Sequence, residues 1–248
     1  MNPVLKLYPI AIVLVIWEVV ARAGLVDPLF LPSFSASMMA LVQNFDLLAT
    51  DSAYSLGRAF FGLLIGACVG VAIGMGMARY RAAESFLDPL VSALFPTPKL
   101  ALFPLLMFWL GLGEGSKVAL IAISAFFPVV INTYAGMRGV DRFLIWNART
   151  KGATALQILM WVMVPAAMPF IFTGLRVATG YAFLLTVAAE MLSANNGLGF
   201  RIIYAQRTFE AETMYAGIIL VAALGFAVDR IVGWIGRHLL AWQDTEKA

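Results

Sequence analysis

Charge, cysteine and histidine are all scarce in this chain. Of its 248 residues, 12% are charged and 62% are hydrophobic, and the mean hydropathy is +0.88; a soluble domain carries about 25% charged residues. The single cysteine, Cys68, excludes a disulfide framework or a thiol pair, and we expect it to pack inside a helix. The single histidine, His238, has no partner at metal-ligand spacing. The composition excludes a soluble domain and predicts a protein that crosses the membrane several times.

The motifs of enzyme chemistry are also missing. The chain contains no His-Glu-x-x-His, no nucleophile elbow and no carboxylate pair. The nearest approach to a phosphate-binding loop is "GLGEGSKV", which has Ser116 in place of the second glycine and Val118 in place of serine or threonine. We therefore expect no catalytic residues, no metal site and no cofactor bound by this chain.

Long apolar runs dominate what is present. Each run is close to the roughly 20 residues that a helix needs to cross the hydrocarbon core, and none alternates as a barrel strand does. The sequence thus predicts an all-α integral membrane protein with a single membrane domain over residues 1–248. We expect six spans, at about 5–23, 54–78, 88–112, 117–137, 164–192 and 212–236. The first is interrupted by Glu18 and Arg22, which we expect to pair. We expect this span to remain in the protein as a helix and not to be removed as a signal peptide.

The basic residues indicate an orientation. Ten of the 17 lysines and arginines fall on one side of the six spans, five fall on the other and two lie within spans. By the positive-inside rule the richer side is cytoplasmic, so both termini are expected in the cytoplasm. The charge is thus explained by topology, and we expect no nucleic-acid partner. The segment 24–53 has no lysine or arginine, fits the outer side, and predicts a short interfacial helix after "PSFS".

Four glycines recur at intervals of four in the second span. They are Gly62, Gly66, Gly70 and Gly74. At that spacing all four lie near one face, where the absence of side chains lets another helix approach closely. Helix packing within one subunit is one interpretation, and a face that slides or lines a pathway is the other.

Of the charged residues in the predicted spans, three are candidates for a pathway or gate: Lys99, Arg176 and Glu190. Around Lys99, prolines 96, 98 and 104 prevent a regular helix and should leave carbonyl groups free. Lys99 and Arg176 either line an anion-tolerant pathway or make structural ion pairs. Glu190 is either part of a gate or docking surface, or a structural cap. For Asn132 and Ser124 we expect hydrogen bonds between helices.

The connection over residues 138–165 is rich in helix signals. Asp141 can cap a short helix, Gly152 can end it in the left-handed conformation, and Thr154 with Gln157 forms a capping box for the next helix. The short helix mixes apolar residues such as Phe143 and Trp146 with basic ones, so it suits either lipid headgroups or a groove on another protein. Pro165 and Pro169 should then break or kink the start of the fifth span.

The run "ARTKGATALQILMWVMVPAAMPFIFTGLRVA" resembles the cytoplasmic loop of binding-protein-dependent ABC importer permeases. Positions that match the signature of that loop are Ala148, Gly152, Val162, Val164 and Pro165. Other segments, among them "DPLVSALFPTPKLALFPLLMFWLGLGEGSK" and "AAEMLSANNGLG", are similar to permeases of the nitrate, sulfonate, taurine and bicarbonate group. The Glu-Ala-Ala of the family falls on Trp146, Asn147 and Ala148, so the acidic residue is absent.

The resemblance implies a type I importer permease fold with a cytoplasmic coupling helix, in a bacterial inner membrane. It implies a second permease subunit, most simply a second copy, cytoplasmic ATPase subunits that hold ATP and magnesium, and an external solute-binding protein that delivers a small anion or nutrient. Residues implied in ATPase coupling are Arg142, Phe143, Trp146, Ala148, Arg149, Gly152 and Pro165. The alternative is a secondary transporter or channel driven by an ion gradient, although no inverted repeat is visible.

Overall fold

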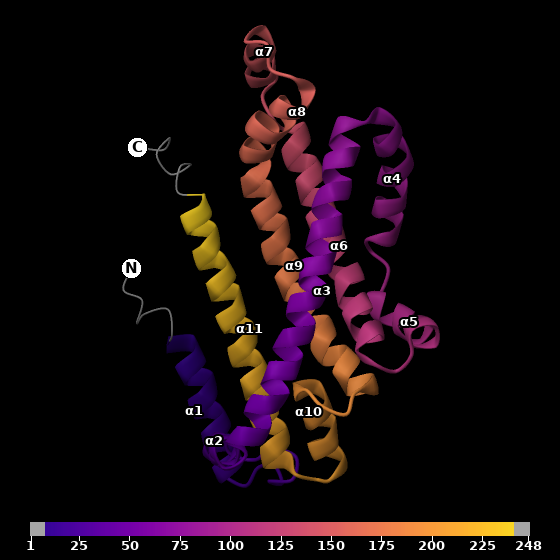
Figure 1. Cartoon of the computed structure of the whole chain (residues 1–248). Coiled ribbons are helices and arrows are strands. Elements are labelled where there is room, and N and C mark those ends of the chain that lie inside the picture. Colours follow the sequence, from indigo (N-terminus) through magenta and orange to yellow (C-terminus); the bar gives the residue numbers. More distant parts are fainter. Residues whose placement is uncertain (1–7, 241–248) are drawn as a thin grey trace. The chain divides into compact units, whose positions relative to one another are not determined.

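A computed structural model describes residues 8–240, and every regular element in that range is a helix. In chain order these are α1 (Tyr8–Arg22), α2 (Phe34–Gln43), α3 (Phe45–Arg79), α4 (Arg81–Leu94), η2 (Lys99–Leu102), α5 (Phe103–Leu110), α6 (Glu114–Arg138), α7 (Arg142–Thr150), α8 (Ala155–Ile158), η3 (Leu159–Met163), α9 (Val164–Ser193), α10 (Leu198–Arg207) and α11 (Ala211–Leu239). The all-α prediction is confirmed (Figure 1).

Within the described range, four helical stretches are long and apolar enough to cross a membrane: Phe45–Arg79, Glu114–Arg138, Ala155–Ser193 and Ala211–Leu239. A fifth span results if α4 and the helical stretch Lys99–Leu110 are counted together, although the two are bent by 97°. The start of the predicted first span, at residues 5–7, lies outside the described residues, and α1 is 15 residues long. The number of six spans therefore stays a prediction.

The described residues group into two compact units. One contains those up to Ser55 together with Glu190–Leu224, and the other contains Leu56–Ala189 together with those from Gly225 on. We call them the first and second units and describe each separately.

In the second unit, the four regularly spaced glycines of α3 lie directly against α6. A methyl group added at Gly70 would come within 2.9 Å of Val129 Cβ, and one at Gly74 within 2.7 Å of Thr133 Cβ. At Gly66 the methyl group would collide with the carbonyl oxygen of Ala122 on α6. Only hydrogen fits at these positions, so the glycines set how closely the two backbones approach.

The chain turns sharply between α4 and α5, as the prolines predict (Figure 1). Lys99 lies at this turn, and its Nζ donates to the carbonyl oxygens of Phe95 and, at 3.3 Å, Leu94. The same ammonium is 4.7 Å from the centre of the Phe127 ring. Because the turn interrupts the helical ladder, Lys99 supplies a donor to the Phe95 carbonyl and a further one to the Leu94 carbonyl, which also accepts from Thr97.

In the first unit, a short helix follows the "PSFS" turn as predicted. Ser33 caps α2 by accepting from Ala36 N at 3.2 Å, and Trp17 Nε1 on α1 donates to Pro32 O at 2.9 Å. The expected pair on α1 is present, with Arg22 Nε 2.6 Å from Glu18 Oε1. A core of Ala40, Leu48, Leu198 and Ala216 joins α2 and the ends of α3, α10 and α11 that belong to this unit.

Candidate functional site

The segment from Asp141 to Gln157 folds as its local signals predict. The Asp141 side chain accepts from Phe143 N at 2.8 Å and begins α7. The helix ends at Thr150, and Gly152, two residues later, has a φ of 79°. Gly152 N donates to Arg149 O, and Ala153 N donates to Ala148 O. That pair of hydrogen bonds is a Schellman motif, which a glycine in the left-handed region completes without strain. Thr154 and Gln157 form the capping box of α8.

α7 exposes most of its side chains. None of its residues is buried, and Phe143, Leu144 and Trp146 are 67%, 45% and 63% exposed. Figure 1 shows α7 beyond the ends of α6 and α9, the two helices that it connects. Exposed aromatic residues on a short polar helix favour contact with another molecule, because large aromatic groups contribute strongly to interfaces.

The inner face of α7 borders a charged cavity of about 830 Å³ within the second unit. Arg142 and Ile145 of α7 line it, together with residues from the ends of α3, α4 and α6. One acidic group in its wall is already paired, since Glu84 Oε1 accepts from Arg138 Nη1 at 2.7 Å and from the Tyr134 hydroxyl at 2.6 Å. α7 therefore has one face toward the protein and one that is open.

Of the break or kink predicted at Pro165, the break is absent, because the helix continues through the proline. Residues Leu159–Met163 form a π-helix, and Val164 N donates to Leu159 O, five residues earlier. Since proline has no N–H and its ring clashes with the carbonyl four residues before it, widening the helix by one residue just ahead of Pro165 removes the conflict. Ala155–Ser193 thus runs as one helical stretch from the end of the α7 loop into the membrane span.

Two further predictions need correction. Asn132 Nδ2 donates to Pro128 O at 2.8 Å, and Ser124 Oγ donates to Leu120 O at 2.9 Å. Both acceptors lie four residues earlier in α6 itself, so these polar side chains bond to their own helix and not across to another.

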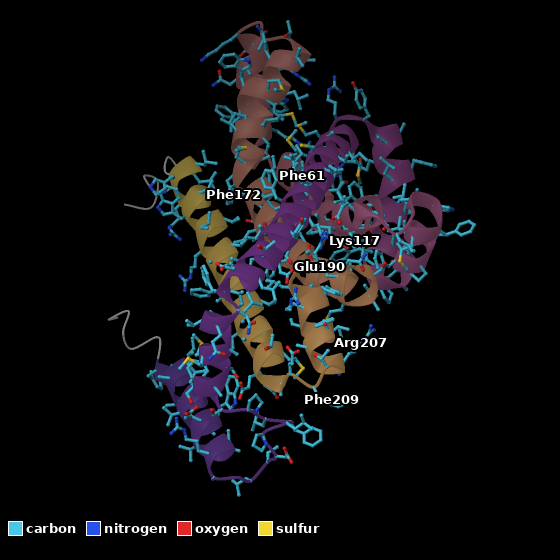
Figure 2. The ribbon with its side chains drawn as sticks, turned by 60° about the horizontal axis from the view of Figure 1, so that its bottom comes forward. Phe61, Lys117, Phe172, Glu190, Arg207 and Phe209 are labelled. Atoms are coloured by element: carbon cyan, nitrogen blue, oxygen red, sulfur yellow. The ribbon has the colours of Figure 1, made fainter. Side chains whose placement is uncertain are left out.

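Arg176 has a carboxylate partner that the sequence reading missed. Its Nε and Nη2 donate to the two carboxylate oxygens of Asp229 on α11, each at 2.9 Å. The side chains remain 55% and 46% exposed. Arg176 was selected because it is a charged residue within a predicted span. Asp229 could have been found in the same way, because it lies within the apolar run of the sixth predicted span. Arg176 lines a second cavity, of about 360 Å³, whose wall also contains Phe172, Gly233 and Arg237. Phe172 is labelled in Figure 2.

Glu190 lies in a buried polar cluster of the first unit. Ser55 Oγ on α3 donates to its carboxylate at 2.8 Å, and the amide nitrogen of Gly199 donates to Glu190 Oε2 at 3.0 Å. Leu198 N donates to Ser55 Oγ at 2.9 Å, so one hydroxyl links the helix start to the carboxylate. Ser55 and Glu190 are 0% and 1% exposed.

Asp51 extends this cluster, one turn from Ser55 on α3. It accepts from Gly197 N at 2.8 Å and from Arg201 Nε at 2.8 Å. Three amides at the start of α10 thus donate to anionic or hydroxyl oxygens, which the positive end of a helix favours. Arg207 and Phe209 lie at the other end of α10 (Figure 2). Sequence reasoning selected Glu190 but missed Asp51, Ser55, Arg201 and α10, since their contacts join segments more than 100 residues apart.

The structure therefore keeps the candidate residues in separate places. Six of the seven coupling candidates lie on α7 and its flanking turn, and the seventh, Pro165, lies at the start of α9. Arg176 lies on α9 opposite Asp229 of α11, and Lys99 lies at the α4–α5 turn. Among residues 8–240 no three histidine, cysteine, aspartate or glutamate side chains are close enough to hold a metal ion. His238 Nδ1 is 2.9 Å from Trp234 O of its own helix.

Related proteins cover nearly the whole chain. A protein of Methanocaldococcus jannaschii named as an ABC transporter permease is 39% identical over 251 residues, 98% of this chain and 94% of the relative. SsuC of Bacillus subtilis, named for transport of aliphatic sulfonates, is 36% identical over 95% of this chain and 86% of its own length. The taurine transport system permease protein TauC of Escherichia coli is 33% identical over 96% and 89%.

Solved structures show the same fold. An amino acid ABC transporter superposes with a TM-score of 0.64 at 18% identity, covering 80% of this chain and 94% of that one. The MetNI methionine ABC transporter in an inward-facing conformation gives 0.60 at 20% identity, covering 82% and 97%. The type I importer permease fold is confirmed. Residues 66–240 match the model of one family, so the chain belongs to the binding-protein-dependent transport system inner membrane components, the permeases of ABC transporters.

Proposed function

We propose that this chain is the membrane-spanning subunit of an ATP-driven importer that moves a small sulfonate, such as taurine or an aliphatic sulfonate, into the cell. The observation that carries the proposal is α7. A nine-residue helix fixed at both ends by caps, with Phe143 and Trp146 exposed, is suited to transmit a motion from a partner protein into the membrane spans.

The partner of α7 is a cytoplasmic ATPase, which holds ATP and magnesium. The residues proposed to act in coupling are Arg142, Phe143, Trp146, Ala148, Arg149, Gly152 and Pro165. Trp146 stands where the family has an acidic residue, and its apolar ring offers an anchor in place of a charge. The unbroken helix from Ala155 to Ser193 supports this role, because a continuous helix transmits displacement better than a hinged one.

The sulfonate assignment is supported by the names of two relatives, SsuC and TauC, which are similar to this chain over at least 95% of its length. An external solute-binding protein delivers the cargo, and a second permease subunit, a copy of this chain, completes the pathway. The whole chain serves as one membrane domain, with both termini in the cytoplasm of a bacterial cell. Of the three intramembrane candidates, we assign Arg176 to the pathway, and Lys99 and Glu190 to structural bonding.

Affinity purification tests the assembly. The tagged chain is extracted from its own host in mild detergent, and the proteins that accompany it are identified by mass spectrometry. We expect a P-loop ATPase in stoichiometric amount. The complex is then reconstituted in vesicles with the binding protein, and uptake of labelled taurine and of an alkanesulfonate is measured with and without ATP. Uptake that persists without ATP would favour the secondary transporter, and uptake of nitrate or bicarbonate in place of both sulfonates would overturn the substrate class.

A further inference from the structure

The cavity of about 360 Å³ between α9 and α11 has a cationic wall. Both of its charged lining residues are arginines, Arg176 and Arg237. The rest of the wall is made by one proline, two glycines and apolar side chains, with one hydroxyl, that of Thr173. Ligand pockets span about 300–1,000 Å³, so this cavity suits a small ligand. All of its lining residues belong to the second unit.

Both guanidinium groups approach the same point, the space beside Gly233. A methyl group added there would lie 3.8 Å from Arg176 Cζ and 3.9 Å from Arg237 Nη1, which is ordinary contact distance. Asp229, Gly233 and Arg237 follow one another at intervals of four and thus share a face of α11. The glycine leaves room between the two cations where any other residue would place a side chain.

Among the residues that the structure describes, the charges around this space do not cancel. Asp229 neutralises Arg176 through two hydrogen bonds. Within residues 8–240 no carboxylate lies at ion-pair distance from Arg237. A guanidinium presents a planar fork of N–H donors that matches an oxyanion, and a charge within a membrane span needs water or a counter-charge. An anion between the two arginines would supply the missing counter-charge.

We propose that Arg176, Arg237 and the space at Gly233 form a transit site for the sulfonate group of the cargo, with Asp229 holding Arg176 in place until the anion arrives. This inference rests on the proposed function and names the residues that the cargo meets inside the membrane. The aromatic ring of Phe172 supplies an apolar wall for the carbon end of the molecule. The same chemistry would bind the phosphate of a lipid headgroup, which the test must separate from a sulfonate.

Cysteine labelling at position 233 tests the site. The variant Gly233→Cys is made in a Cys68→Ala background and assembled with the ATPase in phosphatidylcholine vesicles. It is treated with the membrane-impermeant reagents sulfonatoethyl methanethiosulfonate, which is anionic, and its cationic trimethylammonium counterpart, both on the side of the vesicle from which position 233 is reached. Gly180→Cys on α9 is the control for Arg237, because nothing lies within 4 Å of a methyl group there. Arg176 lies one turn away on the same helix, so this control isolates the effect of replacing Arg237.

We expect the anionic reagent to react about tenfold faster than the cationic one at position 233, since clustered charge raises the local concentration of counter-ions by at least that factor. Methanesulfonate or taurine should slow the reaction. Arg237→Gln should remove the preference and Arg237→Lys should restore part of it, whereas the control shows neither effect. Equal rates for the two reagents, or no reaction with either, would overturn the proposal.

A second comparison distinguishes a lipid headgroup from a sulfonate. If phosphatidylglycerol vesicles protect position 233 and neither sulfonate does, the site binds headgroups and the transit proposal is wrong. Labelling needs no ATP-driven uptake, so the two claims fail separately. Absence of sulfonate uptake by the unmodified complex would contradict the proposed function. Normal uptake with no anion preference at position 233 would contradict only the transit site.

Discussion

Arg176 and Asp229 join two membrane-spanning helices through a pair of parallel hydrogen bonds, each 2.9 Å long. The partners lie on α9 and α11, and both stay about half exposed in the isolated chain. Hydrocarbon would solvate neither charge, so this face is turned to water, to protein or to an anion, and not to lipid tails. This ion pair is the reason for placing the proposed pathway beside α9 and α11.

A double-mutant cycle measures that pair. We expect Arg176→Gln and Asp229→Asn to be coupled by about 0.6–1.7 kcal/mol, the range of interhelical hydrogen bonds in membrane proteins. The free energy of unfolding is measured in mixed micelles for both single variants, the double variant and the parent. Additive effects of the two substitutions would show that the pair does not hold the helices together.

The glycine contacts between α3 and α6 predict opposite signs for two similar substitutions. Gly66→Ala places a methyl group against the Ala122 carbonyl, and such overpacking costs about 1–3 kcal/mol. Gly76→Ala meets nothing within 4 Å and should stabilise α3 by about 0.5–1 kcal/mol, because alanine favours a helix. Thermal unfolding in detergent should give a lower Tm for Gly66→Ala and a higher Tm for Gly76→Ala than for the parent. Equal shifts in Tm would contradict the close approach of α3 to α6.

The sequence predicts what is local in this fold and misses what is long-range. The cap at Asp141, the left-handed Gly152 and the Thr154–Gln157 box depend on neighbours within a few residues, and all three are confirmed. The prolines near Lys99 likewise predict the sharp turn. For Pro165 the same reasoning left a break and a kink open, and the break is absent. A helix can widen into a π turn to keep its continuity, and the proline alone does not say whether it will.

The candidate site divides in the same way. Arg176 and Glu190 stand out because charge is rare in apolar runs, but their partners Asp229 and Ser55 lie 53 and 135 residues away. No periodicity connects such positions. Only the packing of helices brings them together.

The hydroxyl of Ser55 predicts local protection at the start of α10. Ser55→Ala removes the acceptor of Leu198 N–H and a donor to Glu190, and an unmade buried hydrogen bond costs about 1–3 kcal/mol. Because exchange follows the free energy of local opening, a loss of this size should raise amide hydrogen exchange at residues 197–201 by roughly tenfold or more. Ser52→Ala is the matched control, since Ser52 bonds only to Leu48 O of its own helix. Equal exchange in the two variants would contradict the role of Ser55 in linking the start of α10 to Glu190.

The conformation of Gly152 predicts a defect confined to coupling. Gly152→Val forces a branched side chain into a φ of 79°, which costs about 1–2 kcal/mol and displaces the end of α7. Asparagine tolerates that region, so Gly152→Asn should behave nearly as the parent. Both variants should reach the membrane in normal amounts, and the valine variant should lose most ATP hydrolysis stimulated by the loaded binding protein. Full stimulation in the valine variant would remove the turn from the coupling machinery.

ATP hydrolysis by the reconstituted complex carrying Trp146→Ala tests the central claim most directly. Trp109→Ala serves as the control, because Trp109 is 67% exposed and Trp146 is 63% exposed, yet Trp109 lies on α5. If α7 transmits the signal, stimulation by the loaded binding protein falls about tenfold or more for Trp146→Ala, as for a strong interface residue, and stays normal in the control. Normal stimulation with Trp146→Ala, in a complex that still contains its ATPase, would contradict the account.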